Sequence, residues 1–154
     1  ATTVGSIGGG FLSSYFIRRG WTVNKARKTA MLIIAFIVLP VVAARFATGI
    51  SIIVTLISLA AAGHQAWSAN IFTLVSDMFP KKDISSVVGI GSMAGSVGGF
   101  LFPMLIGYVL DAAIANGNKT AGYNFIFILC GVAYLLAWII IQLLVPKLQK
   151  AKVD

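Results

Sequence analysis

The sequence is poor in charge, and above all in negative charge. Only 10% of its 154 residues are charged, four of these are acidic, and there is no glutamate. A soluble globular domain has about a quarter of its residues charged, because charged side chains keep its surface in water. The 58% of apolar residues and the mean hydropathy of +0.95 exclude a soluble domain and a disordered chain. They indicate a membrane protein.

Cysteine and catalytic motifs are equally scarce. The single cysteine, Cys130, lies in an apolar segment, so the sequence predicts neither a disulfide framework nor a thiolate metal cluster. There is no P-loop, Gly-x-Ser-x-Gly, His-Glu-x-x-His or Cys-x-x-Cys motif, so we expect no enzyme, metal or cofactor. A pI near 10 suggests nucleic acid in a soluble protein. Here most basic residues lie between apolar segments, so we expect no nucleic-acid partner.

Four apolar segments are long enough to cross about 30 Å of hydrocarbon. They are approximately residues 29–45, 50–76, 86–110 and 123–145. A shorter apolar stretch, residues 4–17, comes first and is predicted to be half of a further membrane helix. No signal peptide precedes it, and the chain starts at Ala1 without methionine, so we expect an upstream part of the protein.

The basic residues fall in alternate connections between these segments. Residues 18–28, 80–83 and 147–154 hold five, two and three of the twelve, whereas the other connections hold only Arg45 and Lys119. The positive-inside rule places the basic connections in the cytoplasm. The sequence therefore predicts a multi-pass membrane protein with a cytoplasmic C-terminus.

The first basic connection has two interpretations. Its cations are expected to mark topology and to contact anionic lipid headgroups, and the alternative is that they form a cytoplasmic gate. These residues are Arg18, Arg19, Lys25, Arg27 and Lys28. Further along the chain, Asp77 is expected to end its helix in a surface ion pair with Lys81 and Lys82, which would contribute little to stability.

The densest polar cluster inside a span lies at residues 63–70. At about 100° per residue, one arc of the predicted helix carries His64, Gln65, Ser68 and Phe72, with Trp67 and Asn70 beyond His64. Polar side chains near the bilayer centre face protein or a water-filled cavity. We predict that this arc lines a substrate path; the alternative is that its polar side chains bond neighbouring helices. His64 fits both a packing role and a proton carrier.

Small residues form a stripe in the segment at 86–110. Gly91, Gly95 and Gly99 recur every four residues, a spacing that lets helix backbones approach closely. We expect this face to pack against another helix. Ser92 lies beside the stripe and is the best candidate for a polar contact from this segment.

Two features predict that part of the molecule lies elsewhere. The tetrapeptide Gly-Gly-Phe-Leu occurs at residues 9–12 and 98–101, in segments predicted to run in opposite directions, and inverted repeats build many secondary transporters. The acidic residues all lie at span ends or outside the spans; they are Asp77, Asp83, Asp111 and Asp154. A carboxylate that carries protons within the membrane would therefore belong to another part of the protein.

Two stretches resemble a known family. Residues 9–28, with GGFLSSYFIRRGW followed by ARK, resemble the loop between helices 8 and 9 of the major facilitator superfamily, in its anion:cation symporter branch. Residues 64–80, HQAWSANIFTLVSDMFP, followed by VVGIG at 87–91, resemble helices 10 and 11 of hexuronate transporters in that branch. On this resemblance, residues 1–154 are the C-terminal bundle of the fold, from partial helix 8 to helix 12, without the N-terminal half.

The resemblance implies an all-α membrane protein of twelve helices, with two six-helix halves around a central cavity. It implies import of an organic anion, such as a hexuronate or another sugar acid, with protons by alternating access in a bacterial inner membrane. Phe72 and Ser92 match positions where related symporters place cavity-facing side chains. Ser14 stands where the family usually has an acidic residue, so an acidic clamp is not expected there.

Two other functions stay open. One is a structural or assembly subunit of a membrane complex that does not itself transport, in which the polar arc only joins helices. The other is an intramembrane enzyme, for which Ser68 lies one helical turn from His64. No further residue is predicted to orient His64, so the sequence favours transport.

Overall fold

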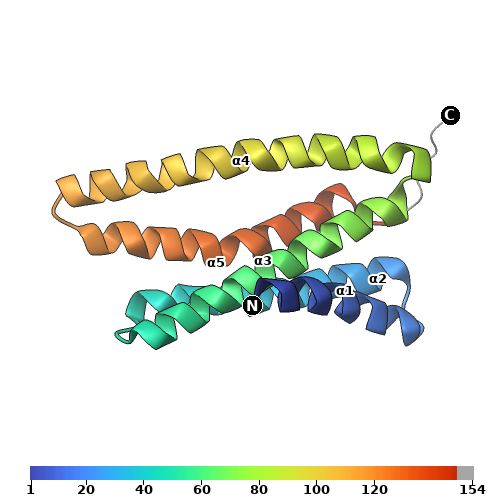
Figure 1. The fold of residues 1–154 in the computed structure, drawn as a ribbon, viewed down its shortest axis with the longest axis horizontal. Coiled ribbons are helices and arrows are strands. Elements are labelled where there is room, and N and C mark those ends of the chain that lie inside the picture. The colour runs from blue at the N-terminus through green and yellow to red at the C-terminus, as the bar shows by residue number, and fades with distance from the viewer. Residues whose placement is uncertain (149–154) are drawn as a thin grey trace.

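The computed structural model describes residues 1–148, which form a bundle of long helices (Figure 1). The elements are α1 (Thr2–Arg18), α2 (Val23–Val38), the 3₁₀ helix η1 (Leu39–Phe46), α3 (Ile50–Met78), α4 (Lys81–Ala115) and α5 (Lys119–Leu144). The described residues contain no strand. The all-α prediction is confirmed, and the five α-helices correspond to the four predicted spans and the shorter helix before them.

Four helical segments are long and apolar enough to span a membrane. They are Val23–Phe46, Ile50–Met78, Lys81–Ala115 and Lys119–Leu144, and they match the four predicted spans. The helices extend past the apolar residues: at 1.5 Å per residue, the 35 residues of α4 measure roughly 50 Å. Polar residues at the ends of α4 therefore continue the helix beyond the hydrocarbon layer.

Local sequence signals set the helix ends. Gly20 adopts a φ of 85° in the turn after α1, and the Thr22 side chain accepts a hydrogen bond from the first turn of α2. Gly117 and Asn118 do the same between α4 and α5, with a φ of 68° and a side-chain cap. Pro40 has no N–H to donate and cannot continue α2, so the chain changes there to η1.

The bundle is densest where α2 lies between α3 and α5. The core consists of Met31, Ile34 and Ala35 of α2 with Ala66, Trp67 and Leu74 of α3, and side chains of α5 such as Leu135 and Trp138 pack against it. The 3₁₀ helix η1 extends the contact of α2 with α3 and α5. Since α2 is the most buried span, its position determines where α3 presents its polar residues.

α1 packs most extensively on α3. A Cβ atom on Gly9 would lie 2.6 Å from Ala66 Cα, and one on Gly5 would also overlap the backbone at Ala62. Gly5 and Gly9 are four residues apart, the spacing that brings helix backbones together. α1 thus approaches α3 closely along these glycines, which was not predicted.

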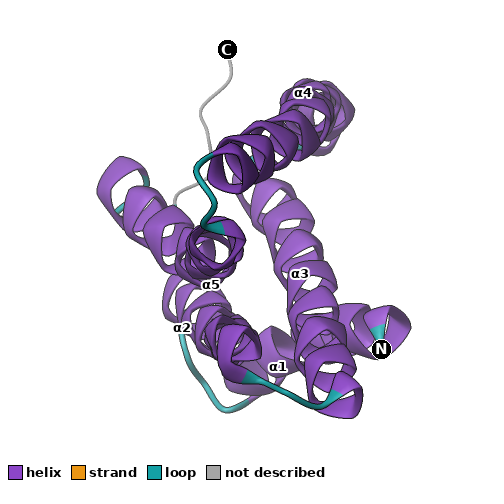
Figure 2. Cartoon of the chain, turned by 90° about the vertical axis from the view of Figure 1, so that its left-hand side faces the viewer, coloured by secondary structure: helices purple, strands orange, loops and turns teal. Residues whose placement is uncertain are grey.

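α4 lies on the far side of the bundle from α1 and α2 (Figures 1 and 2). It contacts α5 and the adjoining part of α3, and none of its residues is buried. Nothing lies within 4 Å of a Cβ atom built on Gly91, Gly95 or Gly99. Within residues 1–148 the glycine stripe therefore has no packing partner, and its packing role stays a prediction. α4 also runs in the direction opposite to α1, as expected for the two Gly-Gly-Phe-Leu segments (Figure 1).

Candidate functional site

A crevice of about 280 Å³ separates α3 from α4 in the half of the bundle nearer their connecting turn. It brings together six of the residues that the sequence singled out: Trp67, Ser68 and Phe72 of α3, and Gly91, Ser92 and Gly95 of α4. Ile71, Val75, Val87 and Val88 complete its apolar wall. Two hydroxyls and two aromatic rings therefore meet in one recess, formed by segments about 20 residues apart in the sequence.

The crevice offers neutral chemistry. Ser68 is half-buried, whereas Ser92 and Phe72 are exposed, with 48% of Phe72 accessible. Hydroxyls donate and accept hydrogen bonds, and an aromatic face packs against the apolar face of a ring. No charged side chain lines the recess, and the described residues contain no group of three or more His, Cys, Asp or Glu side chains that could hold a metal ion. The site suits a hydroxyl-rich ligand.

His64 faces a second cavity, of about 560 Å³, between α3, α5 and the junction of α2 with η1, with Phe102 of α4 also lining it. Its Nδ1 atom lies 2.7 Å from the Tyr134 hydroxyl, and the tautomer of the ring decides which group donates. The Trp67 ring meets the edge of Tyr134 at a centroid distance of 5.3 Å. Sequence reasoning missed Tyr134 as the residue that positions His64. No hydrogen bond joins His64 to Ser68 within residues 1–148, so the structure adds no support for a Ser68 nucleophile.

Asn70 lies on the opposite side of α3 from the crevice. Its side chain is completely buried, and Nδ2 donates to the carbonyl oxygens of Gly9 and Ala66, each at 2.9 Å. Because Gly9 has no side chain, α1 comes close enough for its carbonyl to accept this bond. The structure thus gives Asn70 the role of joining helices, which differs from the predicted role in lining a path.

Gln65 lies one residue after His64 and is exposed. It is not among the residues that line the crevice or the His64 cavity. Within residues 1–148 it therefore stands apart from the other members of the predicted arc. A ligand role for Gln65 stays a prediction.

Arg27 is buried at the basic end of the bundle, with 9% of the residue exposed. Its Nε donates to Asp77 Oδ2 at 2.8 Å, and a second guanidinium nitrogen donates to Ser13 Oγ at 2.6 Å. These bonds join α1, α2 and α3. The expected pairing of Asp77 with Lys81 and Lys82 is wrong, because the first turn of α2 lies against the last turn of α3.

Lys28 is buried next to it, with 5% of the residue exposed. Its ammonium group donates to Gln142 Oε1 at 2.8 Å and to the carbonyl oxygens of Val145 at 2.5 Å and Pro146 at 3.0 Å. The last carbonyls of a helix have no partner within it, so Lys28 satisfies the end of α5.

Burial therefore divides the cations of the first basic connection into two groups. Headgroup contact, expected for all five, is wrong for Arg27 and Lys28, which are held inside the protein. Arg18, Arg19 and Lys25 are exposed. A gating role for this connection stays a prediction.

Comparison with known proteins decides the family. A family model described as Major Facilitator Superfamily matches residues 1–154, the whole chain. The chain belongs to this superfamily. No solved structure matches it.

Three similar relatives are named as transporters of sugar acids. The probable galactarate/D-glucarate transporter GarP of Escherichia coli K12 is 22% identical over 150 residues, which are 97% of this chain and 32% of the relative. The probable galactarate/D-glucarate transporter GudP of the same strain is 25% identical over 147 residues, 96% of this chain and 31% of the relative. The D-galactonate transporter of Escherichia coli O6:H1 is 28% identical over 109 residues, 71% of this chain and 25% of the relative. The chain thus spans between a quarter and a third of the length of these relatives.

Proposed function

We propose that this chain is the C-terminal part of a secondary active transporter that imports a sugar acid together with protons. Membership of the Major Facilitator Superfamily and similarity to transporters named for galactarate, D-glucarate and D-galactonate support the substrate class. The membrane is a bacterial inner membrane. The positive-inside rule supports a cytoplasmic position for the C-terminus and for the connections that hold Arg18, Arg19, Lys81 and Lys82.

In this proposal the α3–α4 crevice binds the neutral part of the substrate. Ser68 and Ser92 exchange hydrogen bonds with sugar hydroxyls, and Phe72 packs against the carbon skeleton. The convergence of these three residues on one recess is the observation that carries the proposal. Trp67 lines both this recess and the cavity that His64 faces. His64, held by Tyr134, therefore contacts water that accompanies the ligand.

The substrate carboxylate and the coupled proton need charged groups that the crevice lacks. Asp77 is paired with Arg27, and the exposed Asp111 lies near the outer end of α4. The rest of the transporter therefore supplies these groups, together with the surface that covers α4. Alternating access would open and close the crevice as the two halves move.

Uptake by the complete transporter in membrane vesicles tests the proposal. Ser68→Ala and Ser92→Ala each remove one hydrogen bond, worth about 1 kcal/mol, so the apparent KM for a sugar acid should rise about fivefold in each variant. The matched control is Thr55→Ala. Thr55 lies on the same helix, and its hydroxyl donates to the backbone carbonyl oxygen of Ser51 at 2.8 Å. The KM of the Thr55→Ala variant should stay at the wild-type value.

Substrate class and coupling are measured in the same assay. A hexuronate, an aldonate and an aldarate of equal carbon number are compared as competitors, and uptake should stop when the proton gradient is collapsed. Unchanged KM values in both serine variants would contradict the proposal that the crevice binds the substrate.

The alternative function is that of a structural subunit that does not transport. The hydrogen bond from Asn70 to the Gly9 carbonyl favours it, because here a polar residue of the arc joins two helices. It predicts that the complete protein binds none of the three sugar acids.

A further inference from the structure

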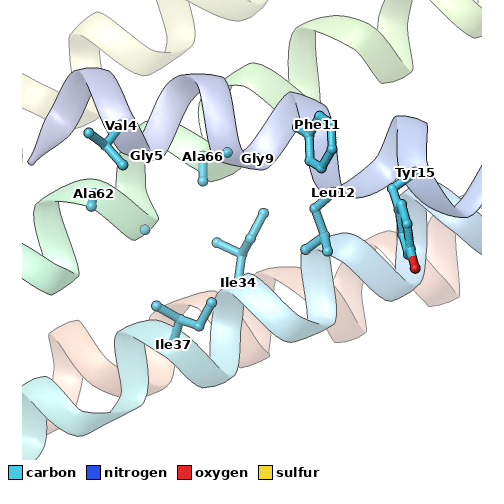
Figure 3. A pocket seen from close by; sticks show the side chains of 12 residues that line it. Val4, Gly5, Gly9, Phe11, Leu12, Tyr15, Ile34, Ile37, Ala62 and Ala66 are labelled. Carbon is cyan, nitrogen blue, oxygen red and sulfur yellow. The ribbon is translucent and has the colours of Figure 1, made fainter.

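A further recess, distinct from the crevice and from the His64 cavity, lies on the side of α3 toward α1 and α2, and its lining is almost wholly apolar. A groove of about 500 Å³ runs between α1 and α2, with α3 as its floor. Phe11 and Tyr15 of α1 and Ile34 and Ile37 of α2 line its two sides, and Ala66 lies on the floor (Figure 3). Gly8 of α1 also lines the groove. No hydrogen-bonding group except the Tyr15 hydroxyl is presented by these side chains. The groove therefore suits a hydrocarbon chain and offers nothing to a sugar acid.

A ladder of aromatic rings leads from this groove to the α1–α2 turn. The Phe11 and Tyr15 rings are stacked with centroids 6.4 Å apart, Tyr15 is 6.0 Å from Phe16, and Phe16 stacks on Trp21 at 4.7 Å. Aromatic residues of this kind gather at the level of the lipid headgroups. The ladder thus connects the apolar groove with the basic end of the bundle.

Two cations lie on the rings of this ladder. The Arg19 guanidinium is 4.7 Å from the centroid of the Tyr15 ring, and Lys25 Nζ is 4.5 Å from the centroid of the Trp21 ring. Cations within about 6 Å of an aromatic face are attracted to it, so both charges are held in place while their side chains stay exposed.

Neither cation is neutralised within residues 1–148. The one ion pair in this part of the chain joins Arg27 to Asp77. Arg19 and Lys25 therefore present two positive charges at the end of an apolar groove in a membrane-spanning bundle. Such a pair complements an anionic headgroup whose acyl chain continues into the groove.

We propose that this surface binds one anionic phospholipid of the leaflet at the basic end, with an acyl chain in the groove and its phosphate on Arg19 and Lys25. The apolar groove alone gives an acyl chain little preference over the bilayer, because the side chains that line it are about as apolar as the lipid tails that the acyl chain leaves. Selectivity comes from the headgroup, since basic residues at a membrane surface attract anionic lipid. The site goes beyond the transport proposal and does not depend on it.

Native mass spectrometry of the complete transporter tests this site. Titration with phosphatidylglycerol and with phosphatidylcholine of the same acyl chains should show tighter binding of the anionic lipid. The double variant Arg19→Gln/Lys25→Gln should lose that preference, with an affinity for phosphatidylglycerol lowered about fivefold per charge. Both residues are exposed, so the variant should fold. Lys81→Gln/Lys82→Gln removes two charges from the same end of the bundle and should leave the affinity unchanged.

A pair of glycines on α1 tests the groove itself. Nothing lies within 4 Å of a Cβ atom built on Gly8 or Gly10, but only Gly8 lines the groove. Gly8→Leu should fill the groove and weaken phosphatidylglycerol binding severalfold, whereas Gly10→Leu should not. Ser68→Ala, which tests the sugar-acid proposal, should leave lipid binding unchanged.

Three outcomes would overturn the lipid site. One is equal affinity for the two lipids, which would leave a nonspecific annulus. Another is an equal loss in the Lys81→Gln/Lys82→Gln control, which would indicate general surface charge. The third is competition by water-soluble glycerol phosphate as strong as that by phosphatidylglycerol, because the ligand would then be a free phosphate and not a lipid.

Discussion

The two sides of α3 differ sharply although they carry similar residues. On the side toward α1 and α2, Asn70 is completely buried and bonded to the Gly9 carbonyl. On the side toward α4, Ser68 and Phe72 border a crevice and no residue of α4 is buried. We refer to the first as the packed side and to the second as the open side.

The difference shows that the role of a polar residue in α3 depends on the face of the helix that carries it more than on its position along the sequence. A polar residue in a membrane helix either bonds a neighbour or meets a ligand, and both explain a polar cluster in the sequence. The role depends on whether the backbone of the facing helix comes close to α3 at a small residue. Gly9 does so for Asn70, whereas Gly91 and Gly95 of α4 have open space before them.

The largest expected effect breaks the ion pair of the packed side. Asp77→Asn leaves the Arg27 guanidinium, 10% exposed, without its carboxylate. Removing one partner of a fully buried pair costs about 3–5 kcal/mol. Because the Asp77 side chain is 29% exposed, we expect a lower value, about 2–3 kcal/mol, measured by thermal unfolding of the complete transporter. The control Asp111→Asn alters an exposed residue of α4 and should match wild type. Equal melting temperatures for the two variants would contradict the assignment.

The next effect concerns the approach of α1 to α3. In Gly9→Leu, the new Cβ atom would lie 2.6 Å from Ala66 Cα, which is too close for both atoms to stay in place. We expect a loss of about 1–3 kcal/mol, the usual cost of overpacking, seen as a lower melting temperature and lower yield. Gly10→Leu, one residue away with nothing within 4 Å, is the control. A stable Gly9→Leu protein would show that this side is less closely packed than described.

A third prediction sets the two sides against each other. Asn70→Ala leaves the Gly9 carbonyl without its side-chain partner and should lower stability by about 1–2 kcal/mol, with an unchanged apparent KM. Ser68→Ala should do the reverse, raising the KM with stability within about 0.5 kcal/mol of wild type. Unfolding and uptake measured on the same two preparations check this. A rise in KM for Asn70→Ala alone would exchange the roles of the two sides.

The smallest expected effect lies between the two sides, at the His64 contact. Tyr134→Phe removes the hydroxyl that lies 2.7 Å from His64 Nδ1. Side-chain hydrogen bonds between membrane helices are worth about 0.6 kcal/mol on average, so the melting temperature should change little. Uptake should fall if Tyr134 orients His64 toward the ligand. Wild-type uptake in this variant would assign the contact to packing.

Much of this fold could be predicted from the sequence because hydrophobic length and basic connections are strong signals. The ends of the four predicted spans lie within about six residues of the observed helix ends, whereas the change from α2 to η1 at Pro40 was not predicted. The packing glycines were predicted in α4, although Gly5 and Gly9 of α1 have the same four-residue spacing. Spacing alone does not say which stripe meets a partner.

The candidate site was harder to predict because it depends on contacts between distant residues. The sequence placed Ser68, Phe72 and Ser92 in one site, and the crevice brings them together. It did not find Tyr134 or the pairing of Arg27 with Asp77, because 70 and 50 residues separate these partners. Such partners become visible only when the helix order in space is known.

In the proposed function, the open side of α3 contacts the sugar acid. The most direct measurement is the labelling of single cysteines by a water-soluble thiol reagent in the complete transporter, in a background that includes Cys130→Ser. We predict that Ser68→Cys and Ser92→Cys react, that a sugar acid slows their reaction, and that Asn70→Cys stays unlabelled. Labelling at position 70 that the substrate slows, with positions 68 and 92 unreactive, would contradict the account.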